Sequence, residues 1–385
     1  MRRTILGLIL SAGLALAAGR GKQPSFYRGH DLSSLLMLEE SDNFFFVDTA
    51  RGNATRPADA ILADGGMNAV RLRIWVNPSD GVYGLNYTLT LAKRFQAAGH
   101  KLYLDFHFAD SWADPQKQPI PAAWPKSDVT SLARTLRAYV ADTLMAFARA
   151  GVELDMVSLG NEIRHGMLWP VGYVDVDTQP FSKLVQNFTN VATLYKAARA
   201  GVDDATTSWA WDSGVKQPQV MIHIDNGWNQ TLQERWFGAL TGAGVPPSAW
   251  DVFGFSFYPF YGTAATFDNL RGSLHALALK YGKPIHVVET DYPAVCNGQY
   301  NPIPESSEPE IPYSVPGQTE WMHDVIKVVQ EVPGGLGRGV WYWEPAWLNN
   351  TSLGSDCNDA ILFQADYSQW PKTIGYSRPS VNFFL

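Results

Sequence analysis

The 385-residue sequence has little cysteine, no clustered positive charge beyond its first residues and only one long apolar run. It contains 30 Lys and Arg against 37 Asp and Glu, a net charge of −7, which excludes a typical nucleic-acid-binding surface. The eight histidines include no H-E-x-x-H motif and no cluster at metal-ligand spacing, so we expect neither a catalytic metal nor a cofactor. The G-x-S-x-G motif is also missing, which removes the usual signature of a serine hydrolase.

The single apolar run lies at the N-terminus. It covers residues 5–18, follows Arg2 and Arg3, and ends in small residues, an order typical of a secretory signal peptide. A buried first helix or a membrane anchor is the alternative, but a bilayer-spanning helix needs about 20 apolar residues. We therefore expect a signal peptide at residues 1–18. The catalytic domain, residues 19–385, should be secreted, extracellular, monomeric and free of the membrane.

Two other features agree with export. An even pair of cysteines, Cys296 and Cys357, occurs in loop-like segments, and in an oxidising compartment such a pair indicates one disulfide. Six asparagines stand in N-x-S/T sequons and are candidates for glycosylation: Asn53, Asn86, Asn187, Asn229, Asn349 and Asn350.

Short β-rich runs alternate with longer helical runs along the chain. The strand candidates are residues 26–31, 69–75, 102–107, 156–160, 220–224, 252–256, 285–289 and 339–343. The helical candidates are residues 57–63, 87–98, 129–150, 181–200, 231–240, 266–281 and 318–331. Eight strands separated by helices predict parallel βαβ units in an α/β protein, and a closed (β/α)8 TIM barrel leaves no sheet edge exposed. An open doubly wound sheet is the alternative, but no G-x-G-x-x-G follows the first strand.

Glycines and prolines mark the ends of several elements. Gly99, Gly151, Gly201 and Gly282 each follow a helical run, where a left-handed C-cap favours glycine. The segment 358–385 contains two prolines and no clean amphipathic run, so we expect its closing helix to be short or irregular. The Pro-rich segment 293–316 follows the seventh strand, on the face where barrel enzymes hold their sites.

Polar and aromatic residues gather where the predicted strands end. Glu162 follows the buried run that ends the fourth strand, and Glu289 ends the seventh in the same way. Each could be a surface carboxylate that caps a helix. Together they can face each other across the barrel mouth, where glycoside hydrolysis uses one protonated and one ionised carboxyl group. Several of the 14 Trp and 16 Tyr lie in loop-like sequence, where their rings can stack on sugars.

Ordered sequence blocks across most of the chain resemble the retaining glycosidases of clan A and, within that clan, glycoside hydrolase family 53, the endo-β-1,4-galactanases. The similarity extends from about residue 26 to 363. It rests on GHDLSS (29–34), RLRIWVNP (71–78), DFHFADSWADP (105–115), GNEIRHGMLWP (160–170), MIHID (221–225), YPFY (258–261), VET (288–290) and YWEPAW (342–347).

The resemblance implies a division of roles among these residues. Glu162 corresponds to the acid/base and Glu289 to the nucleophile, and Asn161 would bind the sugar 2-hydroxyl. Arg73 would support the ionised nucleophile. The other substrate-binding residues implied are His107, His223, Asp225 and Tyr258, with Trp112, Trp169, Trp343 and Trp347 as stacking platforms. The implied partner is β-1,4-galactan, cut inside the chain with retention of configuration.

The sequence departs from the fungal pattern at His165, where a small residue is common, and in its final segment. The Cys296–Cys357 pair resembles the disulfide of fungal members.

A β-1,4-mannanase or endoglucanase of the same clan is the first alternative activity. A barrel that binds wall glycan without cutting it is the second, and the presence of both glutamates argues against it.

Overall fold

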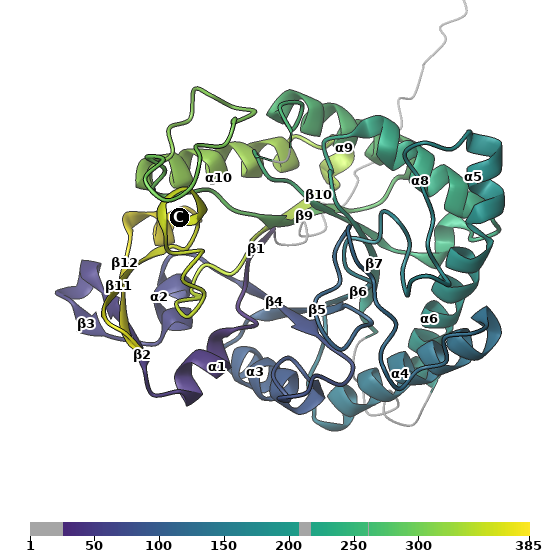
Figure 1. Cartoon of the computed structure of the whole chain (residues 1–385), viewed down its shortest axis with the longest axis horizontal. Helices are drawn as coiled ribbons and strands as arrows, with labels where there is room; N and C mark the ends of the chain where they lie inside the picture. The colour runs from purple at the N-terminus through teal and green to yellow at the C-terminus, as the bar shows by residue number, and fades with distance from the viewer. Residues whose placement is uncertain (1–25, 208–216, 261) are drawn as a thin grey trace, which may run out of the picture.

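A computed structural model describes residues 26–207, 217–260 and 262–385 (Figure 1). The expected signal peptide lies outside these residues. Eight parallel strands close into a barrel in the order β1-β10-β9-β8-β7-β6-β5-β4, which confirms the predicted (β/α)8 fold. The strands are β1 (Tyr27–Asp31), β4 (Ala69–Ile74), β5 (Lys101–Phe106), β6 (Met156–Leu159), β7 (Gln219–Ile224), β8 (Val252–Ser256), β9 (Ile285–Thr290) and β10 (Gly337–Tyr342).

Helices surround the barrel as an outer ring (Figure 1). They are α1 (Leu35–Glu40), α2 (Ala58–Asp64), α3 (Leu85–Ala97), α4 (Val129–Arg149), α5 (Phe181–Asn187), α6 (Thr189–Thr207), α8 (Gln230–Gly242), α9 (Phe267–Tyr281) and α10 (Val315–Gln330). The main apolar core lies between the strands and this ring. A second cluster of strand side chains includes Tyr103 and Trp341 and fills the barrel. Gly29 makes room for it, because a Cβ there would lie 2.0 Å from the Trp341 ring.

Two expectations about helices are wrong. The helix predicted at residues 181–200 is two helices, α5 and α6, and α6 continues to Thr207. Gly201 therefore does not cap a helix. It lies inside α6, where a Cβ would come within 2.5 Å of the Arg137 carbonyl oxygen on α4. This glycine lets two helices approach closely, whereas Gly99, Gly151 and Gly282 have the positive φ expected of C-caps.

The C-terminal segment contains strands where a closing helix was expected. β11 (Phe363–Gln369) and β12 (Lys372–Ser377) form a hairpin, followed by the short 3-10 turn Pro379–Asn382. Strand β12 pairs in parallel with β2 (Phe44–Asp48), which also pairs with β3 (Ala54–Thr55). This four-stranded sheet lies outside the helical ring beside α1 and α2 (Figure 1).

The long segment after β9 is tied to the segment after β10. Cys296 and Cys357 form the predicted disulfide. The adjacent Asp356 carboxylate accepts hydrogen bonds from the backbone N–H groups of Asn297, Tyr300 and Asn301 at 2.8–3.1 Å. These contacts fix the Pro-rich segment over one side of the barrel mouth.

Glycosylation of the six sequons stays a prediction. Asn53, Asn86 and Asn187 are exposed. Asn229 caps α8 by accepting from the Leu232 N–H, and Asn349 is half-buried with its Nδ2 3.8 Å from a methionine sulfur. The first three are therefore the better acceptors. Within the described ranges, every helix is too short or too polar to cross a bilayer.

Candidate active site

A cleft of about 930 Å³ opens where the barrel strands end. Its walls include nine of the residues predicted from the sequence: Arg73, His107, Trp112, Asn161, Glu162, Asp225, Tyr258, Glu289 and Trp343. Each lies at or just after the carboxyl end of a strand, which is where barrel enzymes place their sites. His223, Trp169 and Trp347, also predicted, are not among the lining residues.

Glu289 stands at the end of β9 and is held by a cation and a hydroxyl group. Its Oε1 lies 2.6 Å from Nη2 of Arg71, and its Oε2 accepts from the Tyr258 hydroxyl at 3.1 Å. Burial raises the pKa of Glu289, whereas Arg71 and Tyr258 act to lower it. The two contacts therefore favour the ionised form of a carboxyl group that burial alone would keep protonated.

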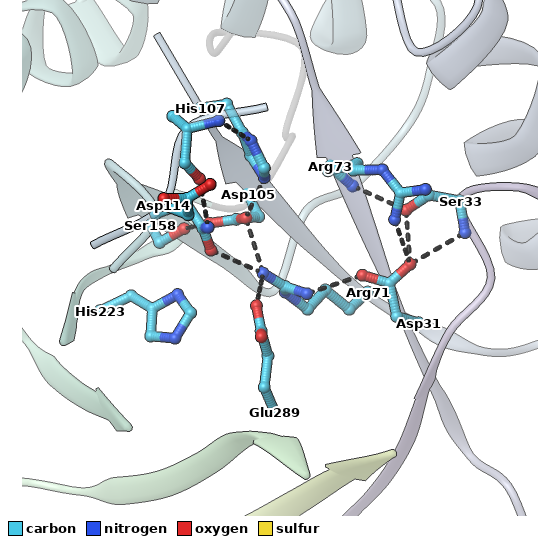
Figure 2. A network of polar contacts seen from close by, with 12 residues as sticks. Asp31, Ser33, Arg71, Arg73, Asp105, His107, Asp114, Ser158, His223 and Glu289 are labelled. Carbon is cyan, nitrogen blue, oxygen red and sulfur yellow. Dashed lines mark hydrogen bonds and ion pairs between the residues drawn. The ribbon is translucent and has the colours of Figure 1, made fainter. Parts of the chain in front are cut away.

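Arg71 is the centre of this network (Figure 2). Besides Glu289 it contacts Asp31 and Asp105, each at 2.7 Å, and it donates to Asn161 Oδ1 at 3.0 Å. Only 1% of its side chain is exposed. The planar guanidinium of arginine suits several fixed acceptors at once.

The expectation that Arg73 supports Glu289 is wrong. Arg73 contacts Glu344 at 2.6 Å and Ser34 at 2.9 Å, and its guanidinium lies 4.6 Å from the Trp112 ring centre. The side chains of Arg71 and Arg73 lie on the same face of β4, because they are two positions apart in the strand. Arg73 is the one nearer the barrel mouth. It reaches the aromatic wall of the cleft, and Arg71 reaches the carboxylates below.

Glu162 follows Asn161 just beyond β6, with a positive φ of 48°. Burial raises the pKa of Glu162 well above its usual value, and the charges of Glu289 and Asp225 add to this effect. The two glutamates therefore have different surroundings. Glu289 faces an arginine, and the charges that act most strongly on Glu162 are carboxylates.

Asn161 is fixed before any ligand arrives. Its Nδ2 donates to the Ala113 carbonyl at 2.8 Å, and its own carbonyl accepts from Gln118 Nε2 at 2.8 Å. With Oδ1 bound to Arg71, the amide orientation is set by the network, and one Nδ2 hydrogen is left for a ligand.

A family model described as Glycosyl hydrolase family 53 matches residues 27–373. The chain belongs to this family. It is 41% identical over 338 residues to a probable arabinogalactan endo-β-1,4-galactanase A of Aspergillus fumigatus, covering 87% of this chain and 88% of the relative. It is also 41% identical to an arabinogalactan endo-β-1,4-galactanase of Humicola insolens, covering 88% and 94%.

Solved structures agree with the assignment to family 53. A fungal β-1,4-galactanase structure matches with a TM-score of 0.80 at 39% identity, over 93% of this chain and 98% of the other. The family 53 catalytic domain of Ignisphaera aggregans matches with a TM-score of 0.74 at 26% identity, over 94% and 95%. A family 10 endoxylanase shares only the fold, with a TM-score of 0.53 at 13% identity, over 93% and 96%. This protein is thus a glycoside hydrolase.

Two histidines of this family 53 enzyme lie at and below the cleft floor. Nδ1 of His107 accepts from the Ala113 N–H at 3.2 Å, so its proton sits on Nε2, 3.3 Å from Asp105. His223 is fully buried, with Nε2 2.8 Å from the Ser256 hydroxyl that lines the cleft. Burial lowers the pKa of His107 and lowers that of His223 to about 3, so both rings are neutral.

Asp225 also lines the cleft, and its carboxylate lies 3.2 Å from Nε of Arg164. Burial raises its pKa to about 7, against the effect of Arg164. It can therefore present either a hydroxyl donor or a carboxylate acceptor near neutral pH.

Three of the four predicted tryptophan platforms of this hydrolase form one cluster. Trp112 lies 6.4 Å from Trp343 and 5.9 Å from Trp347, measured between ring centres. Trp347 is thus a support behind Trp112. Trp169 lies apart, 5.0 Å from the exposed Tyr173, and donates to the His165 carbonyl at 2.9 Å.

Among the cleft residues that the sequence did not single out as site residues are Arg71 and Asp291. Arg71 stands two positions before Arg73 and could have been found from the alternation of the strand. Asp291 comes two residues after Glu289 and carries no motif signal. In the part of the chain that the structure describes, no three His, Cys, Asp or Glu side chains are grouped to hold a metal ion.

Proposed function

We propose that this family 53 hydrolase is an endo-β-1,4-galactanase that cuts galactan with retention of configuration. The relatives at 41% identity carry the name arabinogalactan endo-β-1,4-galactanase, and they are matched over most of their length. The cleft of about 930 Å³, with the rings of Trp112 and Trp343 in its wall, is large enough for several sugar units of a polysaccharide chain.

The observation that carries the mechanism is the ion pair between Arg71 and Glu289. A nucleophile must be ionised before attack, and the guanidinium favours that form. Glu162 lies among negative charges that favour its protonated form, as an acid requires. We therefore assign Glu289 as the nucleophile and Glu162 as the acid/base.

The reaction proceeds in two displacements. Glu289 attacks the anomeric carbon while Glu162 gives its proton to the leaving glycosidic oxygen, which yields a glycosyl ester. Glu162, now ionised, then removes a proton from water, and the water hydrolyses the ester. Asn161 donates its remaining amide hydrogen to the sugar 2-hydroxyl. When the ester is hydrolysed, Glu289 becomes a carboxylate again and its ion pair with Arg71 is restored.

The other predicted residues contribute as binding groups. His107, Asp225, Tyr258 and Arg73 border the cleft, and His223 acts through Ser256. Trp112 and Trp343 provide stacking faces, and Trp347 holds Trp112 in place. Trp169, with Tyr173, belongs to a more distant part of the binding surface.

The protein is secreted as a monomer, its signal peptide is removed, and its disulfide suits an oxidising compartment.

The first prediction concerns the substrate. The purified protein should release short galacto-oligosaccharides from unbranched β-1,4-galactan, with far less reducing sugar from mannan or cellulose. A reducing-sugar assay over this panel checks it. Turnover on mannan or cellulose equal to that on galactan would favour one of the alternative clan A activities.

The second prediction separates the two glutamates. With an aryl β-galactoside that has an activated leaving group, Glu162→Ala should still form the glycosyl ester, and azide should speed its release as a β-galactosyl azide. Glu289→Ala should lose activity on every substrate, and azide can rescue it only with inversion, to the α-azide. Without azide, either variant should lose at least about 10²–10⁴-fold on galactan. An α-azide from Glu162→Ala with a β-azide from Glu289→Ala would reverse the roles.

A further inference from the structure

Asp291 is a third carboxyl group in the cleft that the mechanism above does not use. It follows β9 directly, two residues after Glu289, and lines the cleft with only 5% of its surface exposed. Its Oδ1 is buried and has no hydrogen-bond partner among the described residues. Burying a polar atom without a partner is unfavourable, so buried polar groups in folded proteins are nearly always satisfied.

The neighbouring protein groups do not supply this partner. The Tyr342 hydroxyl on β10 donates to the Ala360 carbonyl at 2.5 Å and accepts from the Tyr292 N–H at 3.2 Å. The oxygens of Glu289 are engaged by Arg71 and Tyr258. A group bound in the cleft that Asp291 lines is therefore the candidate for this partner.

Burial and the charge of Glu289 raise the pKa of Asp291 to about 8. The ionisable group that acts on it is Glu289, two residues earlier on β9, and the hydroxyl group of Tyr342 on β10 is in turn affected by Asp291. At neutral pH the group is an uncharged carboxylic acid, with one O–H donor and a carbonyl acceptor. It can thus hydrogen-bond a sugar hydroxyl without adding a negative charge beside the nucleophile.

The surroundings of Asp291 make such a bond selective. The wall formed by the segments after β9 and β10 consists largely of apolar side chains: Pro293, Pro302, Pro304, Leu353 and Ala360. Ser352 and Asn358 are its other polar members, and Asp291 is its titratable carboxyl group. A few polar groups in an apolar wall fix the orientation of a ligand.

We propose that Asp291 is a specificity-determining substrate contact, whose carboxyl group donates a hydrogen bond to a hydroxyl of the sugar that lies against this wall. The inference deepens the proposed hydrolase function of the same cleft and adds a contact to it. A substrate lacking that hydroxyl leaves the carboxyl group unpaired and is discriminated against.

The test compares Asp291→Asn, Asp291→Ala and the control Asp142→Asn, which makes the same amide substitution on the exposed side of α4. The substrate is whichever polysaccharide the wild-type enzyme cuts fastest in the panel above. At pH 6, Asp291→Ala should lower kcat/KM about tenfold or more, because it removes the donor. Asp291→Asn keeps a neutral donor and should stay within about threefold of wild type, as should the control.

The pH dependence distinguishes this contact from a structural role. The ratio of kcat/KM for Asp291→Asn to that for wild type should rise between pH 7 and pH 9, because only the wild-type group loses its proton. A ratio that stays flat overturns the proposal, as does wild-type kcat/KM in Asp291→Ala. If Asp291→Ala does not fold, the pH dependence of kcat/KM in Asp291→Asn alone tests the proposal. Failure to cut galactan would count against the substrate assignment and leave this test intact.

Discussion

At the scale of single residues, Arg71 is the side chain that links Glu289 to three other polar residues. Four acceptors from four strands or strand ends converge on its two terminal nitrogens: Asp31, Asp105, Asn161 and Glu289. Ser158 and His107 in turn hold Asp105. Although burial works in the opposite direction, Arg71 and His107 keep the pKa of Asp105 below its usual value. The cluster thus couples the charge of Glu289, the proposed nucleophile, to the position of Asn161.

The third prediction follows for Arg71→Lys. A lysine keeps the charge but not the planar array of donors, so kcat should fall about 10²–10³-fold, as when a preorganised donor is removed. The acid limb of the pH–activity profile should move to higher pH, because Arg71 lowers the pKa of Glu289 and its contribution is weakened. Activity profiles between pH 3 and 8 measure this shift.

Arg73→Lys is the matched control. Arg73 contacts Glu344 and the aromatic wall, so its loss should raise KM and leave the acid limb in place. An unmoved acid limb in Arg71→Lys, or the same movement in both variants, would contradict the assignment of Arg71 to the nucleophile.

At the scale of elements, the strands and their order were predictable, since the barrel strands are short and largely buried and several of them are nearly continuous apolar runs. All eight were placed within two residues of their observed bounds. The positions of Glu162 and Glu289 at strand ends followed from this. The pairing of Arg71 with Glu289 did not, because β4 presents Arg71 and Arg73 on one face and only their height in the barrel separates them.

The second sheet was not predictable from local sequence. The strands β2 and β12 pair although they lie far apart in the chain. Nothing in the sequence of either strand indicates which segment it pairs with. Gly201 was misjudged for a related reason. A glycine after a helical run can end the helix or admit a neighbouring helix, and only the packing of α4 on α6 decides between them.

The fourth prediction uses that helix pair. Gly201→Ala should lower the free energy of unfolding by about 1–3 kcal/mol, because its Cβ would overlap the Arg137 carbonyl and Val140. Gly272→Ala, in α9, is the matched control, since the nearest atom to its Cβ is 4.0 Å away. That change should stabilise by about 0.5–1 kcal/mol through helix propensity. Urea unfolding gives both values, and the same sign for both variants would refute the close-approach explanation.

At the scale of the whole molecule, the first barrel strand and the last residues of the chain share one core. His30 on β1 is fully buried, and its ring packs against Phe383, Phe384 and Tyr342 at 5.2–6.2 Å. Both ring nitrogens lack a hydrogen-bond partner among the described residues. The C-terminal residues are therefore docked on a histidine that must be neutral in the folded state.

The fifth prediction is that His30 weakens the fold in acid. Burial lowers its pKa to about 3, whereas in an unfolded chain it is about 6.5. Between these values the unfolded state binds more protons, so stability falls as the pH falls from about 6.5 towards 3. His30→Leu removes this effect. Its melting temperature relative to wild type should be higher at pH 4.5 than at pH 7.5, and a constant difference would show that His30 does not titrate.

The pairing of β2 with β12 has a consequence for synthesis on the ribosome. The hydroxyl of Thr49, next to β2, bonds with Ser377, at the end of β12, across 328 residues of chain. At about 5–20 residues per second, roughly 15–65 seconds pass between the appearance of the two. Throughout that interval the run Phe44-Phe45-Phe46-Val47 has an open strand edge, the kind of surface to which chaperones and other nascent chains attach. A segment translated later thus shields one translated earlier, and a chain that terminates before residue 372 keeps this apolar edge uncovered.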